Sequence, residues 1–111
     1  MSEYTPDNWV IVEISGTDVP ETYHRILAGW HGGYLYGDSW KMSSGVTKIV
    51  DCDTHWAIHN HSGSIYNCHK NNERLAGMTF GVLNSYSKEN SDTIKFDVVK
   101  VETLLETYCE K

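Results

Sequence analysis

The stretch WAIHNHSGSIYNC, residues 56–68, carries the clearest hairpin pattern in the chain and sets the fold class. Two short runs with strand character flank the Ser-Gly pair at 62–63, which forms a tight turn because glycine accepts a positive φ. A two-residue turn at this point places His59 opposite Tyr66 in the hairpin. We therefore expect an antiparallel sheet to be built around this segment.

Further strands are predicted on both sides of the hairpin by β-branched runs and by alternation of apolar and polar residues. They cover residues 9–14, 23–28, 34–36, 45–50 and 94–99. The glycines at 32–33 and the Gly-Asp-Ser segment at 37–39 predict turns on either side of the short strand 34–36.

A helix is expected to begin near Glu73, with Asn71 or Asn72 as its N-cap. The side chains of its inward face then recur at helical spacing, at Leu75, Met78, Thr79, Val82, Leu83 and Tyr86. Gly77 and Gly81 are four residues apart and share one face of this helix. Because glycine has no side chain, that face is expected to lie close to the sheet.

A short C-terminal helix is expected after the last strand. Its inward residues are Val101, Leu104, Leu105 and Tyr108, and its outward residues are Glu102, Glu106 and Glu110. The elements together predict one α+β domain over residues 1–111, a strongly bent antiparallel sheet or small open barrel with one packed helix and a short C-terminal helix. One core is expected to join sheet and helix through Trp9, Ile11, Ile26, Val46, Ile58, Met78, Val82 and Leu83.

Composition narrows the class of partner. The chain has a formal net charge of −6 at pH 7, which argues against duplex nucleic acid, whose phosphates need basic charge. It shows no signal-peptide pattern at its start and no apolar run long enough for a membrane span. An odd count of three cysteines then favours reduced thiols in a cytoplasm. At least one sheet edge is expected to be open and to need covering, which favours a homodimer or larger assembly.

A metal site is considered and not favoured. Six possible ligands lie between residues 52 and 69: Cys52, His55, His59, His61, Cys68 and His69. The expected hairpin register puts His55, His59, His61 and Cys68 on one face. Their spacing, however, is not that of a structural zinc module, so we expect no metal and no cofactor.

Catalytic motifs are also missing. Cys68 and His69 are neighbours, and adjacent residues of a strand point to opposite faces, so the imidazole cannot easily activate the thiol. The chain has no Gly-x-Ser-x-Gly elbow, and no helix opens after its Gly-rich segment to form a phosphate loop. A binding protein is therefore expected rather than an enzyme.

The segment AGWHGGYLYGDSW, residues 28–40, is the candidate binding surface, with four large rings among four glycines. The expected ligand-binding residues are Arg25, Trp30, Tyr34, Tyr36, Asp38, Ser39, Trp40 and Lys41. The rings would stack on a planar base, the two cations would meet phosphates, and the carboxylate and serines (with Ser43 and Ser44 near the lysine) would bond a ribose or base edge. The alternative is that the two tryptophans anchor the core and the tyrosines cover sheet edges. A fallback site lies around His59, His61, Tyr66 and His69.

The stretches DNWV (7–10), AGWHGGYLYGDSW (28–40) and SGSIYNCHK (62–70) resemble a group of short uncharacterised proteins of tailed bacteriophages, T4-like and marine ones in particular. The likeness covers roughly residues 7–86 and implies a phage product acting in the host bacterial cytoplasm.

By analogy with that context, the expected function is immune evasion. The protein would sequester a nucleotide-derived signalling ligand, of the cyclic oligonucleotide or ADP-ribose type, without turning it over. The alternative is an inhibitor or modulator of a host enzyme, with exposed aromatic side chains as its hot spots and an acidic surface that suits a basic partner.

Replacing Tyr34 or Tyr36 by alanine tests the aromatic surface. Because a stacked base is worth about 1–3 kcal/mol, either change should weaken ligand binding about tenfold or more without unfolding the protein. Calorimetric titration and thermal melting of the same variants measure the two effects. Variants that melt and bind like the unchanged protein would make this surface merely structural.

Overall fold

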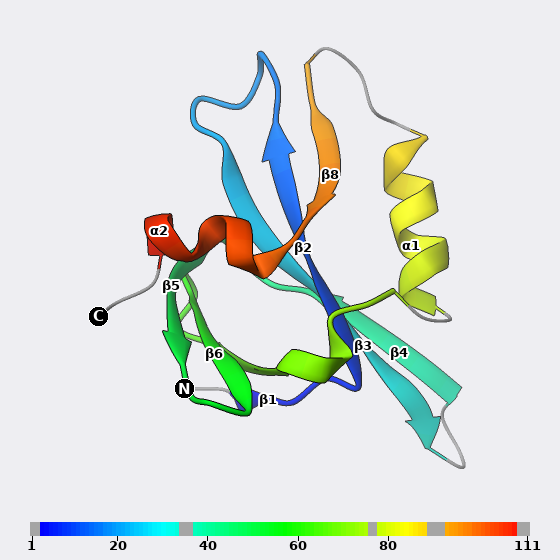
Figure 1. Ribbon diagram of the computed structural model, residues 1–111. Helices are drawn as coiled ribbons and strands as arrows, with labels where there is room; N and C mark the ends of the chain where they lie inside the picture. The colour runs from blue at the N-terminus through cyan, green and yellow to red at the C-terminus, as the bar shows by residue number, and fades with distance from the viewer. Residues whose placement is uncertain (1–2, 34–36, 76–77, 89–92, 109–111) are drawn as a thin grey trace.

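Two four-stranded sheets form the body of the protein in the computed structural model, which describes residues 3–33, 37–75, 78–88 and 93–108 (Figure 1). The first sheet has the order β1 (Glu3–Tyr4), β7 (Ile65–His69), β6 (His55–Asn60) and β5 (Val46–Asp51). The second has the order β4 (Gly37–Met42), β3 (Tyr23–Gly33), β2 (Asn8–Ser15) and β8 (Lys95–Val99). Neighbouring strands are antiparallel except for β1 and β7, which pair in parallel.

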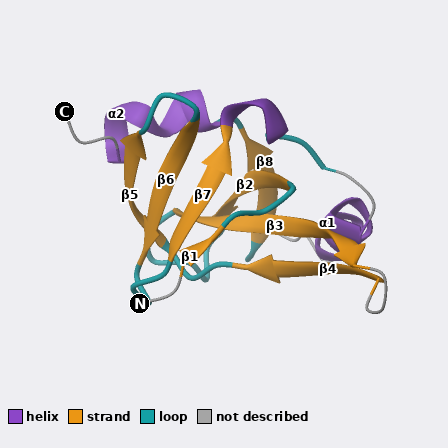
Figure 2. Ribbon diagram, turned by 90° about the horizontal axis from the view of Figure 1, so that it is seen from below, coloured by secondary structure: helices purple, strands orange, loops and turns teal. Residues whose placement is uncertain are grey.

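Four helical segments pack against these sheets in the described part of the chain. They are η1 (Lys70–Asn72), α1 (Met78–Ser87), η2 (Val101–Leu104) and α2 (Leu105–Tyr108). Helix α1 contacts β3, β4 and β8, whereas α2 contacts β5 of the other sheet (Figure 2). No helix in the described part of the chain has the length and apolar character needed to cross a bilayer.

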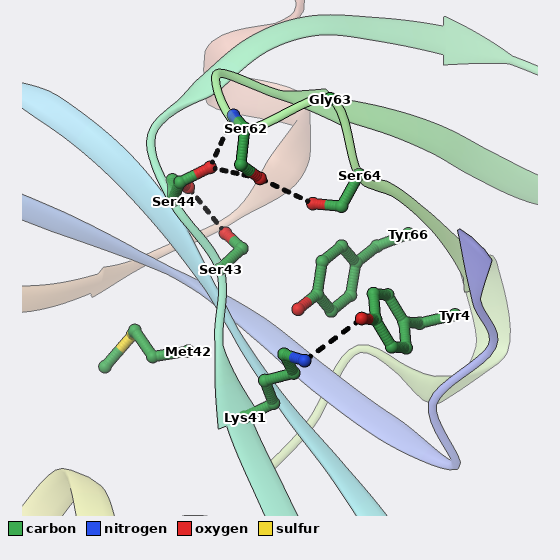
Figure 3. A pocket seen from close by; sticks show the side chains of 9 residues that line it. All are labelled: Tyr4, Lys41, Met42, Ser43, Ser44, Ser62, Gly63, Ser64 and Tyr66. Atoms are coloured by element: carbon green, nitrogen blue, oxygen red, sulfur yellow. Dashed lines mark hydrogen bonds between the residues drawn. The ribbon is translucent and has the colours of Figure 1, made fainter. Parts of the chain in front are cut away.

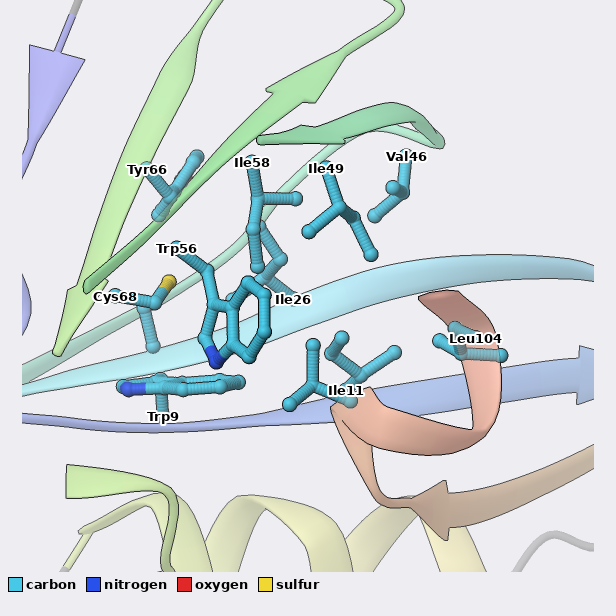
Figure 4. Close-up of a cluster of buried hydrophobic side chains, with 12 residues drawn as sticks. Trp9, Ile11, Ile26, Val46, Ile49, Trp56, Ile58, Tyr66, Cys68 and Leu104 are labelled. Carbon is cyan, nitrogen blue, oxygen red and sulfur yellow. The ribbon is translucent and has the colours of Figure 1, made fainter. Parts of the chain in front are cut away.

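Strand β2 is buried on both of its faces. Trp9 and Ile11 point into a cluster between the two sheets, where they meet residues such as Trp56 and Ile58 (Figure 4). Val10 and Val12, which alternate with them, point to the opposite face and pack in a second cluster beneath α1. The run Trp-Val-Ile-Val is continuously apolar because neither face of the strand meets water.

The α+β class, with a packed helix and a short C-terminal helix, is confirmed. The strands do not form one bent sheet, and neither sheet closes into a barrel. They divide into two sheets, and the chain passes from one to the other after β1, after β4 and after β7. Strand patterns are local, whereas the choice of partner strand is not, so the sequence does not indicate this division.

The expectation of one core is wrong, because the sheet containing β2 separates two clusters. The predicted members Trp9, Ile11, Ile26, Val46 and Ile58 lie together between the sheets. Val82 and Leu83 pack against the second cluster on the other face. The side chain of Met78 lies outside the described part of the structure.

The predicted turns around 34–36 are also corrected. Strand β3 continues through Gly33, and β4 begins at Gly37, so these glycines face each other across the ladder. The pairing shifts register between Trp30 and Gly33. Glycine suits such an irregular end of a ladder as well as it suits a turn. The strand predicted at 34–36 lies outside the described residues.

Helix α1 begins at Met78, five positions after the predicted start at Glu73. Glu73 instead forms a parallel β-bridge with Trp9, and its carboxylate accepts a hydrogen bond from the Val101 amide at 2.8 Å. This segment therefore links β2 to the C-terminal helical turns. Those turns are as predicted: Val101 and Leu104 are buried while the glutamates at 102 and 106 are exposed.

Close packing of α1 on the sheet depends on Gly29 of β3 and not on Gly81. A Cβ atom on Gly29 would lie 2.6 Å from Cγ2 of Thr79 and 2.9 Å from Oδ1 of Asn8. The Thr79 hydroxyl donates to that same Asn8 oxygen at 2.8 Å, and both side chains are buried. Gly81 is exposed, and a Cβ atom there would meet nothing within 4 Å. The expected role of Gly81 is therefore wrong.

Alanine substitutions at these two glycines should have opposite effects. Gly29→Ala forces Thr79 and Asn8 apart and should lower the free energy of unfolding by about 1–3 kcal/mol. Gly81→Ala fills open space within a helix and should raise it by about 0.5–1 kcal/mol. Urea unfolding of both variants provides the measurement, and a stabilising Gly29→Ala would contradict the packing described.

Candidate functional site

The alternation of β4 distributes the predicted aromatic site over two faces of its sheet. Ser39 pairs with Trp30 and Lys41 with Ala28, whereas Trp40 pairs with Gly29. Trp30 and Lys41 therefore face the first sheet, where Trp30 packs against the cluster between the sheets. Trp40 faces α1 and lines a hollow of about 250 Å³ with Val82, Ser85 and Tyr86. The two tryptophans do not share a pocket.

Two of the predicted residues are engaged in holding the fold. The indole Nε1 of half-buried Trp30 donates to the Thr5 carbonyl at 3.1 Å, and its ring meets Tyr4 edge-on with centroids 6.2 Å apart. Arg25 donates from Nε to the Ser43 carbonyl at 2.5 Å, which fixes the connection after β4. Their predicted role in ligand binding has no support from these contacts.

The structure describes only some of the remaining predicted residues. Ser39 is exposed on β4. Tyr34 and Tyr36 lie outside the described residues, and so does the side chain of Asp38, whose backbone belongs to β4. Stacking on the two tyrosines therefore stays a prediction. Lys41 lines a different pocket from Trp40.

This pocket has a volume of about 350 Å³ and lies where both sheets approach the β6–β7 turn (Figure 3). It is lined by Tyr4, Lys41, Met42, Ser43, Ser44, Ser62, Gly63, Ser64 and Tyr66. Strand β1 contributes Tyr4, β7 contributes Tyr66, and the remainder come from β4 and the two connections 43–45 and 61–64. We refer to it as the serine pocket.

Three serine hydroxyls form a hydrogen-bonded chain along one side of the serine pocket. Ser44 donates to the Ser62 hydroxyl at 3.0 Å and accepts from the Ser62 amide at 3.0 Å. The hydroxyls of Ser62 and Ser64 lie 3.2 Å apart, and either can be the donor. The buried Ser43 hydroxyl is engaged in the fold, since it accepts from the Ile26 amide and donates to the Ser44 carbonyl. These three serines thus present uncharged hydrogen-bonding groups to the pocket.

The opposite side of the serine pocket carries Lys41 and two tyrosines. The ammonium group of Lys41 donates to the Tyr4 hydroxyl at 3.0 Å and lies 4.5 Å from the centre of the same ring. The Tyr4 and Tyr66 rings are 4.9 Å apart and tilted by 34°. Burial raises the pKa of Tyr66 to about 12, with smaller contributions from Tyr4 and Cys68. Tyr66 therefore stays an uncharged phenol at neutral pH and does not repel an anion.

The charge of the serine pocket is opposite in sign to that of the chain. Lys41 is the charged group among its nine described lining residues, and none of the nine is Asp, Glu or His. The whole chain has a formal net charge of −6. A pocket that offers an ammonium group and hydroxyl donors and lacks carboxylates suits an anionic ligand.

The histidines and cysteines that the structure describes do not gather as a metal site. The hairpin pairs Ile58 with Tyr66 and Trp56 with Cys68, one residue away from the predicted register, because the connection 61–64 is longer than a two-residue turn. A shift of one residue reverses the faces, so Cys68 points into the core and away from the face of His55. Burial raises the pKa of the Cys68 thiol well above its usual value. Among the described residues no group of three metal-ligating side chains occurs, and the His55 and His69 rings pair 5.8 Å apart.

Sequence reasoning identified part of the serine pocket. Lys41 with the neighbouring Ser43 and Ser44 was expected to serve a ligand, and Tyr66 belonged to the fallback site. The histidines of that fallback site do not line the pocket. Tyr4, Ser62 and Ser64 were missed as site residues, because they meet Lys41 only through pairing of distant strands.

A scan against protein-family models, a search of curated proteins and a search of solved structures found no match to the chain.

The raised pKa of Tyr66 predicts a loss of stability in alkali. The folded protein holds the phenol proton up to pH about 12, whereas the unfolded chain releases it near the ordinary value of 10. The contribution to stability is complete below pH 10 and is lost as the pH rises to about 12.

Urea unfolding between pH 9 and pH 12 measures this effect. The loss should be smaller in Tyr66→Phe and unchanged in the control Tyr23→Phe, whose ring is 39% exposed. An equal loss in both variants would contradict the assignment to Tyr66.

Proposed function

We propose that this protein binds a small nucleotide-derived anion in the serine pocket and sequesters it without chemical turnover. The observation that carries the proposal is the presence of Lys41 beside hydroxyl groups in a pocket whose described lining includes no carboxylate, on a chain of net charge −6. An acidic protein repels anions at long range. A pocket that attracts an anion on such a protein therefore depends on the particular residues that line it. The setting that we propose is the host bacterial cytoplasm during phage infection.

The size and donors of the serine pocket support such a ligand. A volume of about 350 Å³ falls at the lower end of the range for small-molecule sites, which suits one nucleotide unit. A lysine ammonium group has three N–H donors, and one is directed to the Tyr4 hydroxyl. The others remain for a phosphate oxygen, with which a charge-assisted bond is about twice as strong as a neutral one.

Binding without turnover is supported by the partners of the serines. A serine acts as a nucleophile when a general base accepts its proton, and histidine or a carboxylate is the usual base. No His, Asp or Glu is found among the described residues that line the pocket, and the hydroxyls of Ser44, Ser62 and Ser64 bond one another. This arrangement favours recognition of a ligand over attack on it.

Protein binding is the second candidate function, and the outer face of α1 favours it. Phe80 is 57% exposed, and Trp40 beside the helix is 40% exposed. Large exposed aromatic side chains are typical hot spots of protein interfaces. A basic host enzyme would suit the negative chain. Open edges at β4 and β8 offer, in addition, a surface for the homo-oligomer that we propose.

Replacing Lys41 by methionine tests the anion site. ADP-ribose or a cyclic dinucleotide at 100 times its dissociation constant should stabilise the unchanged protein by about 2.7 kcal/mol. For a chain of this size that free energy corresponds to a rise in Tm of roughly 10 °C. Lys41→Met should abolish the rise, and adenosine, which has no charge, should cause none.

Lys95→Met is the matched control, because Lys95 is an exposed lysine at the start of β8 and does not line the pocket. It removes the same charge and should keep the full rise in Tm. Equal responses of the two variants would overturn the serine pocket as the anion site. A host enzyme bound equally well by both variants, with no response to any anion, would favour the second function.

A further inference from the structure

The serine pocket has two ends of different chemistry. Lys41 and Tyr4 form a cationic end, and the chain of serine hydroxyls forms an uncharged end (Figure 3). The ring of Tyr66 lies between them and supplies an apolar wall. A ligand that fills the pocket therefore meets a positive charge at one end and hydroxyl groups at the other.

The serine chain always keeps one hydroxyl hydrogen for a ligand. Each serine has one O–H donor, and that of Ser44 is directed to Ser62. The bond between Ser62 and Ser64 takes one of the two remaining hydrogens, in either direction. The other hydrogen has no acceptor among the described residues, and the serine oxygens retain lone pairs.

Because the Ser62–Ser64 bond can reverse, the chain can donate to a ligand or accept from it at the same position. A ligand hydroxyl, which also donates and accepts, matches such a pair of groups better than a pure acceptor does. The exposed location of Ser62 leaves its hydroxyl within reach of a bound molecule.

From these contacts we infer that the serine pocket binds a phosphorylated sugar. Lys41 contacts the phosphate, and Ser62 and Ser64 form hydrogen bonds with the sugar hydroxyls. The inference rests on the proposed anion site and narrows its ligand to the sugar phosphate part of a nucleotide. The inference assigns the phosphate and the sugar to groups that line the pocket and assigns no lining group to the base.

Two probes that share the phosphate and differ in the sugar test this inference. Calorimetric titration should show that ribose 5-phosphate binds the unchanged protein at least about tenfold tighter than methyl phosphate, as expected from two or more hydrogen bonds of ordinary strength. In the double variant Ser62→Ala/Ser64→Ala the two probes should bind within about twofold of each other. Lys41→Met should lose both probes.

Ser15→Ala is the matched control, since Ser15 is a half-buried serine at the end of β2 that does not line the pocket and belongs to no predicted site. It should keep the preference for ribose 5-phosphate. If both probes bind the unchanged protein equally, or the double variant keeps the preference, the sugar inference is overturned while the anion site stands. If neither probe binds while ADP-ribose or a cyclic dinucleotide still raises the Tm of the unchanged protein, the sugar inference is overturned and the anion site stands. If none of these anions binds, both the inference and the proposed function are overturned.

Discussion

Burial of β2 on both faces is the constraint on which the structure depends. The strand lies between β3 and β8, so its apolar side chains meet either the space between the sheets or the underside of α1. Trp9 adds a long-range link, because its indole donates to the His69 carbonyl at the end of β7, 2.8 Å away. The first sheet, the second sheet and α1 are thereby positioned with respect to one strand.

Local sequence patterns predicted most of the strands and the C-terminal helical turns. The pairing of strands that are distant in the sequence could not be predicted in the same way. The strands around Trp9 and Phe96 and the inward face at Val101 and Leu104 follow from alternation and helical spacing, which act within a few residues. The predicted hairpin register was wrong by one residue, because composition does not distinguish the longer connection at 61–64 from a two-residue turn. That single shift moves Cys68 from the face that it was expected to share with three histidines into the core.

The same distinction explains which site residues were found. Lys41 could be predicted from its neighbours in the sequence, because it follows a segment rich in aromatic rings and lies close to Ser43 and Ser44. Tyr4 reaches it from another sheet through β1, a strand of two residues that pairs in parallel with β7. Nothing in the sequence around Tyr4 indicates that neighbour, since parallel pairing of distant segments leaves no local pattern.

Because successive side chains of β4 point to opposite faces of the sheet, the aromatic segment contributes to two surfaces. Its composition alone had predicted a single surface. Gly29 and Thr79 hold α1 close to one face of the sheet, and that face includes Trp40. Lys41, the next residue, must then point to the opposite face, where it meets Tyr4. An apolar hollow beneath α1 and a cationic pocket against the first sheet therefore arise from adjacent residues. A ligand or partner of one surface has no steric reason to exclude a partner of the other.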